Sequence, residues 1–111
     1  MQRLLQKRFL STPTVRPLWM LRYTYVDGML EKRDPFRGDH LRHVEIHSAG
    51  SHTPKVLLAG AFANPVDGAA FVFDAKDAGQ VEAFAKKDPY VINNLVTKFD
   101  VRPYNVVSFE K

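Results

Sequence analysis

The side chains best suited to chemistry include histidines that are grouped on one predicted helix. His40, His43 and His47 are spaced by three and four residues, which places all three on one side of a helix. Imidazole transfers protons near neutral pH, and three imidazoles together can bind zinc. No carboxylate completes a recognised zinc motif here, and His52 follows in a predicted loop. We therefore expect no metal, a solvated polar face for this helix side, and His40 as the candidate for proton transfer.

Other polar residues can complete a site around this histidine. Asp88 follows the second predicted helix, where its carboxylate can orient an imidazole and stabilise its charge. Alternatively, Asp88 is a turn residue before proline, with no chemistry. Arg33 and Arg37 precede His40 and can hold an anionic or enolate-like substrate oxygen, although solvated surface arginines fit the sequence equally well. Tyr90 can line the same pocket or simply pack.

Length and composition limit the classes of protein and of site. A chain of 111 residues fits one domain, and 45% hydrophobic with 25% charged residues is typical of a globular protein. The chain has no cysteine, which excludes disulfides, thiolate zinc sites and cysteine nucleophiles. Gly60 and Gly68 fit neither the phosphate-loop nor the dinucleotide-binding spacing. We therefore expect no cofactor.

The first residues have the composition of a mitochondrial leader. No acidic residue occurs from Met1 to Val26, while Arg3, Lys7 and Arg8 alternate with leucines and Phe9. We interpret residues 1–16 as a transit peptide and linker that direct the protein to the mitochondrial matrix, and residues 17–111 as the domain. An incidentally basic, disordered terminus is the alternative interpretation.

The remaining charge and hydropathy argue against two kinds of partner. Without the three basic residues of the first ten, 13 basic and 12 acidic residues remain of the 16 and 12 in the whole chain. This near neutrality gives no reason to expect nucleic-acid binding. No run approaches the roughly 20 apolar residues that span a bilayer, so we expect a soluble mature protein without a membrane partner.

Hydrophobic patterning and turn residues predict six elements in the order β-α-β-β-α-β, with the second helix capped by Asp77. The predicted strands are Leu18–Val26, Val56–Phe62, Ala70–Phe73 and Thr97–Phe109, and the predicted helices are Arg37–Ala49 and Ala78–Lys86. This order is the split βαβ motif. It predicts a ferredoxin-like α+β fold, with two helices on one face of a four-stranded antiparallel sheet.

The sheet face without helices is a candidate interface. We assign Trp19, Leu21, Phe71 and Phe73 to this face, because they alternate along two predicted strands. No further layer remains in the chain to cover them, and an exposed apolar face usually marks an interface. The sequence therefore predicts a homodimer formed through the sheet face.

Several short segments, taken in order, resemble the YciI-like (YCII-related) family. They are Leu30-Glu31-Lys32-Arg33, Arg37-Gly38-Asp39-His40-Leu41, Leu57-Leu58-Ala59-Gly60, and Asp88-Pro89-Tyr90-Val91 ahead of Arg102-Pro103-Tyr104. Each segment is weak alone, but their order and spacing are fairly specific. The resemblance covers about Tyr23 to Val107, which is essentially the whole predicted domain.

The resemblance implies a dimeric α+β barrel with a histidine and an aspartate at its active site, which correspond here to His40 and Asp88. One related member eliminates chloride from a hydroxylated aromatic, and muconolactone isomerases are structural relatives. We therefore expect a cofactor-independent lyase or isomerase acting on a small aromatic or lactone-like metabolite. A non-catalytic dimeric ligand-binding or assembly module is the alternative. Ala61, where the family often has proline, and the long Ser48 to Lys55 loop leave the substrate open.

Overall fold

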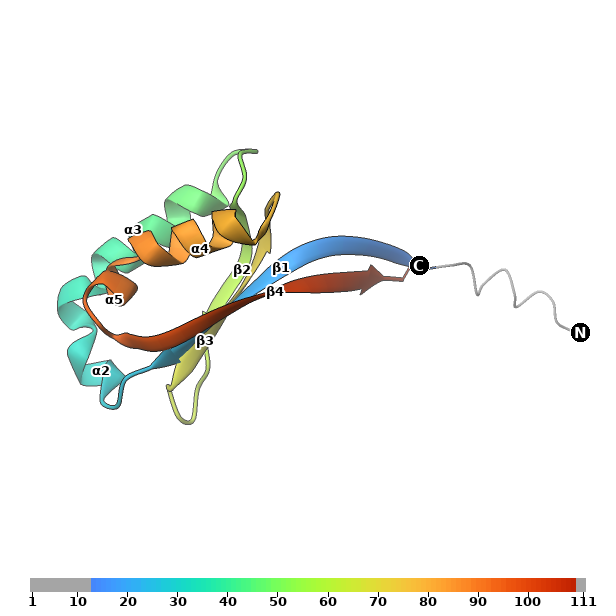
Figure 1. Ribbon diagram of the computed structural model, residues 1–111. Helices are drawn as coiled ribbons and strands as arrows, with labels where there is room; N and C mark the ends of the chain where they lie inside the picture. The colour runs from blue at the N-terminus through green and yellow to red at the C-terminus, as the bar shows by residue number, and fades with distance from the viewer. Residues whose placement is uncertain (1–12, 110–111) are drawn as a thin grey trace, which may run out of the picture.

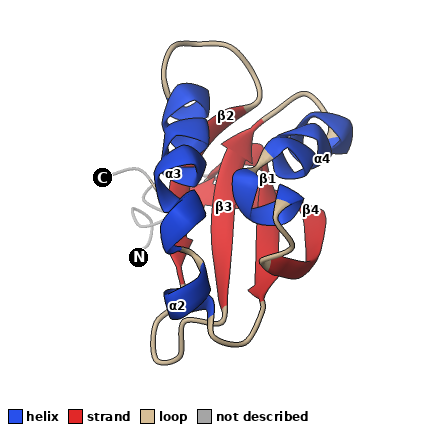
Figure 2. Ribbon diagram, turned by 90° about the vertical axis from the view of Figure 1, so that its left-hand side faces the viewer, coloured by secondary structure: helices blue, strands red, loops and turns tan. Residues whose placement is uncertain are grey.

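The computed structural model describes residues 13–109, which form one antiparallel sheet and a layer of helices. The elements are β1 (Thr14–Tyr25), α2 (Met29–Lys32), α3 (Asp34–Ser48), β2 (Lys55–Ala61), β3 (Gly68–Asp74), α4 (Ala78–Lys87), α5 (Pro89–Ile92) and β4 (Val96–Ser108). The strands lie in the order β2-β3-β1-β4 with every pair antiparallel. Figures 1 and 2 show α3 and α4 on the same face of this sheet. The predicted ferredoxin-like fold is confirmed.

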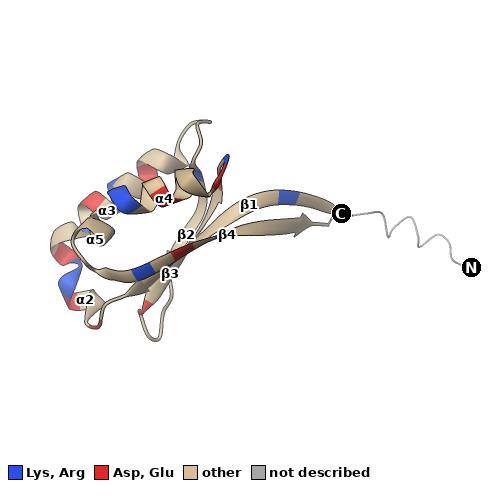
Figure 3. Ribbon diagram, in the orientation of Figure 1, with Lys and Arg blue, Asp and Glu red and all other residues tan. Residues whose placement is uncertain are grey.

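The helix ends follow from local chemistry. Helix α4 is capped as predicted, because the Asp77 carboxylate accepts a hydrogen bond of 3.0 Å from the Gln80 backbone N–H. Helix α3 begins three residues earlier than predicted, with Pro35 in its first turn, where a helix has no partner for a backbone N–H. The short helices α2 and α5 were not predicted. Figure 3 shows basic and acidic residues interspersed along the helices.

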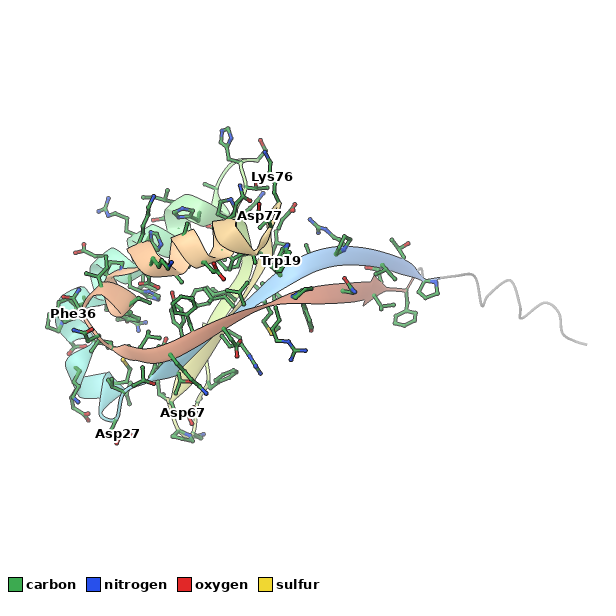
Figure 4. All side chains as sticks on the ribbon, in the orientation of Figure 1. Trp19, Asp27, Phe36, Asp67, Lys76 and Asp77 are labelled. Atoms are coloured by element: carbon green, nitrogen blue, oxygen red, sulfur yellow. The ribbon has the colours of Figure 1, made fainter. Side chains whose placement is uncertain are left out.

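The core lies between the helices and the sheet. It contains residues that the sequence pattern had assigned to the sheet face without helices. Leu21 and Phe73 are 0% exposed and Phe71 is 2% exposed, and both phenylalanines contact Phe84 of α4. Trp19, labelled in Figure 4, packs against the same core. The predicted residues of the dimer interface are therefore wrong. Both sides of these strands carry apolar residues, and alternation alone does not tell which side the helices cover.

The opposite side of the sheet, which we call the open face, carries the alternate residues. The strand register places Leu18, Met20, Leu58, Val72 and Tyr104 there. Their neighbours on this face are charged as well as apolar, since Arg22 forms an ion pair of 2.9 Å with Asp100.

Strands β1 and β4 continue as a two-stranded ribbon away from the rest of the domain (Figure 1). The pairing runs out to Thr14 opposite Ser108, so Thr14 to Arg16, which we had counted as linker, belong to β1. Val15 and Val107 face each other across the ribbon and are 54% and 44% exposed. Residues 1–12, which hold most of the predicted leader, lie outside the described residues. No helix within residues 13–109 has the length and hydropathy to cross a membrane.

Candidate functional site

The structure brings His40 and Asp88 into direct contact. His40 lies in the second turn of α3, and Asp88 lies between α4 and α5, 48 residues later. The Nδ1 atom of His40 is 2.8 Å from one Asp88 carboxylate oxygen and 3.0 Å from the other. Asp88 is 0% exposed and His40 is 7% exposed. The pair is therefore buried, which strengthens the electrostatic effect of the carboxylate on the imidazole.

Two further donors hold the Asp88 carboxylate. The Tyr23 hydroxyl donates to it at 2.7 Å, and the Tyr90 backbone N–H donates at 3.0 Å, so that Asp88 also caps α5. A carboxylate only accepts hydrogen bonds when ionised, so the His40 nitrogen that faces it must carry a proton. In the neutral imidazole, this arrangement places the proton on Nδ1 toward Asp88 and leaves the Nε2 lone pair available to accept a proton.

Aromatic rings hold the imidazole from the sides. The Tyr90 ring stacks on His40 with centroids 3.8 Å apart and an interplanar angle of 7°, and Phe71 meets it edge-on at 6.5 Å. The flat stacking fixes the orientation of the imidazole within the site. Tyr90 thus combines the two roles that the sequence left open, because it packs in the core and also lines the site.

A cavity of about 260 Å³ opens beside His40, between α3 and strands β2 and β3. Its polar wall consists of Tyr25, Arg33, Arg37, His40 and Tyr90. Its apolar wall consists of Leu41, Val44, Ala59, Ala61, Ala69 and Phe71. The small side chains of β2 leave the space that a larger residue would fill. All of the predicted substrate-binding residues therefore lie at the same cavity as His40.

The tyrosines of the site remain protonated near neutral pH. Burial is the main reason why the pKa of Tyr23 is raised, and the neighbouring Asp88 charge adds to it. Burial raises the pKa of Tyr25 to about 12, with Arg33 and Arg37 opposing the shift. The pKa of Tyr90 is also raised, chiefly by burial. Each hydroxyl can therefore act as a hydrogen-bond donor.

Sequence reasoning did not single out Tyr23 or Tyr25. Tyr23 lies 65 residues before Asp88, and nothing in its local sequence distinguishes it from other strand residues. The β-α-β-β-α-β order combined with the strand period could have placed both tyrosines on the helix-covered face, but only if the correct face had been known.

The other two histidines of α3 do not join the site. His43 Nε2–H donates to the Phe84 carbonyl at 2.9 Å and the ring stacks on Phe84 at 4.3 Å, while His47 Nδ1–H donates to the His43 carbonyl. The predicted solvated polar face is therefore wrong at His43, whose pKa is lowered mainly by burial. Within residues 13–109, no group of three or more side chains is arranged to hold a metal ion.

Comparisons with known proteins bear on the fold. No protein-family model and no curated protein matches the chain. The solved 5-chloro-2-hydroxyhydroquinone dehydrochlorinase TftG of Burkholderia phenoliruptrix, in complex with 2,5-dihydroxybenzoquinone, is similar with a TM-score of 0.66 and 19% identity, over 78% of this chain and 92% of that chain. Protein SO0527 of Shewanella oneidensis is similar with a TM-score of 0.52 and 14% identity, over 87% and 99%. These likenesses show the fold, which is the ferredoxin-like α+β arrangement of one antiparallel sheet with helices on one face.

Proposed function

We propose that this protein is a cofactor-independent lyase or isomerase, in which His40 transfers a proton and Asp88 holds the imidazole in the required tautomer. One observation carries the proposal. The His40 Nδ1 atom is bound to a fully buried carboxylate, while the same ring forms part of a cavity wall. A positioned base beside a small, partly apolar cavity is the usual arrangement for general acid/base catalysis.

The reaction starts at Nε2 of His40, which takes a proton from a substrate carbon. In an elimination, the electron pair of that C–H bond forms a new double bond, the leaving group departs with the electron pair of the bond that held it to carbon, and the imidazolium then releases the proton to solvent. In an isomerisation, the imidazolium returns the proton to a different carbon of the same molecule. The Asp88 charge stabilises the imidazolium in both cases.

The similar enzyme TftG supports the choice of reaction class, since it is a dehydrochlorinase solved with a quinone ligand. The short segments described above support membership of the YciI-like family, and the substrate would then be a small aromatic or lactone-like metabolite. Arg33, Arg37 and Tyr90 would bind this substrate, because they line the cavity beside His40.

A metabolite screen by thermal shift tests the proposal, because a ligand that binds only the folded state raises the melting temperature. Hits are then assayed for turnover. His40→Gln should lower the turnover by about 100-fold or more, since a proton-transfer group contributes roughly 10²–10⁴-fold. His47→Gln, on the same helix but away from the cavity, is the matched control. If His40→Gln converts a confirmed substrate as well as the wild type does, the acid/base mechanism is wrong.

We also propose that two copies of the chain associate through the open face. Leu58 and Tyr104 on this face are 69% and 43% exposed, although both are large and apolar. The projecting ribbon exposes Val15 and Val107 on its other side, and a two-stranded ribbon without further packing is only marginally stable in water. A second copy that covers the face and the ribbon would bury the exposed apolar side chains and stabilise the ribbon. The alternative function, a non-catalytic binding or assembly module, would use the same surface.

Light scattering tests this association. The wild type should have twice the chain mass, and Leu58→Asp should shift the population toward the monomer while the helix content stays unchanged. Ile46→Asp is the control, because Ile46 is 62% exposed on α3 rather than on the sheet. A wild type that stays monomeric at micromolar concentration contradicts the proposal, and so does an equal effect of both variants.

We propose further that the basic leader delivers the protein to mitochondria. The support is its acid-free, amphipathic sequence. A fluorescent reporter fused to residues 1–30 should enter mitochondria, whereas a reporter fused to residues 17–111 should not. A diffuse signal from the first fusion contradicts the proposal.

A further inference from the structure

Two polar atoms beside the cavity have no hydrogen-bond partner among residues 13–109. They are Nε of Arg33 and the hydroxyl of Tyr90, and both atoms are buried. The Arg37 guanidinium lies close enough to the Tyr90 hydroxyl to oppose the rise of its pKa, but the two groups do not reach hydrogen-bond geometry. Tyr90 is only 2% exposed, and both side chains line the cavity. Burying a polar group without a partner is costly, so such groups are rare in native proteins. Two of them at one cavity indicate that a ligand supplies the missing partner.

The charged residues around the cavity indicate the charge of that ligand. Arg33 and Arg37 both line it, and none of its lining residues among those described is acidic. The Asp88 carboxylate behind His40 already accepts hydrogen bonds from three groups and lies on the far side of the His40 ring from Nε2. Arginine side chains without a carboxylate partner favour an anion, and they bind oxygen anions through strong, charge-assisted hydrogen bonds.

The remainder of the cavity defines the rest of the ligand. Leu41, Val44 and Phe71 line the rest of the cavity with apolar side chains. The volume of about 260 Å³ lies just below the roughly 300–1,000 Å³ of pockets for drug-sized molecules. A compact molecule with one charged oxygen-bearing end and one apolar body fits these features.

We propose that the cavity binds a compact organic oxyanion, either a carboxylate or an ionised phenol or enol. The anionic oxygen receives hydrogen bonds from Arg33 Nε and the Tyr90 hydroxyl, and the apolar body lies against Phe71 near His40. This inference deepens the proposed function and rests on it in treating the ligand as the substrate. The raised pKa of Tyr90 keeps its hydroxyl protonated, so that it can donate to the anion.

Titration with 4-nitrophenol tests the ligand class, because the ionised form of this phenol has its own visible absorbance. The full chain should bind the anion in preference to the neutral phenol, so the ionisation midpoint of the bound phenol should fall below that of the free phenol. Benzoate should displace it, and the uncharged benzyl alcohol should not. Displacement by benzoate tells whether a carboxylate is accepted as well as a phenolate.

Matched variants connect the binding to the unpaired atoms. Arg33→Met should weaken anion binding by about ten- to a hundredfold, and Tyr90→Phe, which keeps the ring, by about tenfold. Arg42→Met, an exposed arginine of the same helix outside the cavity lining, should leave binding unchanged. Thermal unfolding of each variant checks that it is folded.

The proposal is overturned if no probe binds at millimolar concentration, if benzyl alcohol competes as well as benzoate, or if Arg42→Met weakens binding as much as Arg33→Met. These outcomes are separate from a failure of the catalytic proposal. Anion binding that survives in His40→Gln, with no turnover of any anion, refutes catalysis and keeps the ligand class. His40-dependent turnover of an uncharged substrate, unaffected by Arg33→Met, refutes the ligand class and keeps catalysis.

Discussion

Replacing Asp88 by Asn separates the charge of this carboxylate from its shape. The wild-type side chain accepts hydrogen bonds from His40 Nδ1, the Tyr23 hydroxyl and the Tyr90 backbone N–H at 2.7 to 3.0 Å, and it is 0% exposed. Asparagine has the same size, but it has only one acceptor oxygen and adds an NH₂ donor. Its NH₂ group can satisfy His40 Nδ1 only if the imidazole proton moves to Nε2. The cavity then faces an N–H donor in place of a base.

The expected loss of stability follows from the number of bonds. Hydrogen bonds to a charged group contribute about 1.5–3 kcal/mol each and neutral ones about 0.5–1.5 kcal/mol, so three bonds lose about 3 kcal/mol together. Asparagine avoids the cost of burying an ionised group, which offsets part of this loss. We expect Asp88→Asn to lower the free energy of unfolding by about 2 kcal/mol, which corresponds to roughly 8–16 °C in Tm for a domain of this size.

Asp77→Asn is the matched control. Asp77 also caps a helix and accepts one backbone N–H at 3.0 Å, but it is exposed. Asn and Asp are equally good caps, so this change should cost less than about 0.5 kcal/mol. Urea unfolding of both variants at pH 7 measures the difference in the free energy of unfolding. Turnover of the ligands found in the thermal-shift screen measures the loss of activity. If Asp88→Asn is as stable as Asp77→Asn, the buried network contributes nothing and our reasoning about it is wrong.

The remaining predictions concern tyrosine ionisation and close packing around the site. Between pH 10 and about pH 12, unfolded chains lose tyrosine protons that folded Tyr23 and Tyr25 keep, so the free energy of unfolding should fall by about 1.4 kcal/mol per pH unit for each of them. Urea unfolding at several pH values should show a smaller fall of this free energy with pH in Tyr23→Phe, and an unchanged pH dependence contradicts the prediction. A Cβ on Gly68 would lie 2.5 Å from the Tyr23 carbonyl, so Gly68→Ala should shift β1 and lower both Tm and ligand binding; an unchanged Tm contradicts this. Phe71→Ala should cost about 3–5 kcal/mol by leaving a cavity in the core, and a loss of dimer mass without a loss of stability would contradict its core position.

Much of the fold was predictable from the sequence because its causes are local. The alternation of side chains along a strand, the apolar spacing along a helix and the Asp77 cap all depend on residues a few positions apart. Each predicted element occurs in the structure, with ends shifted by a few residues. The order of these elements then allowed few topologies for so short a chain. His40 near the start of a helix and Asp88 after a helix were also visible as local features.

The arrangement of the site depended on tertiary structure, because it joins residues far apart in sequence. The helices cover the side of the sheet on which packing buries more apolar surface in total. A strand with apolar residues on both sides does not show which side this is. That choice placed Phe71 in the core instead of at an interface and brought Tyr23 to Asp88, 65 residues away. It also turned His43 onto α4 and left Arg33 Nε and the Tyr90 hydroxyl without a hydrogen-bond partner among residues 13–109, at the cavity beside His40. The sequence by itself thus determined which residues could do chemistry, and packing across the sheet decided which of them meet.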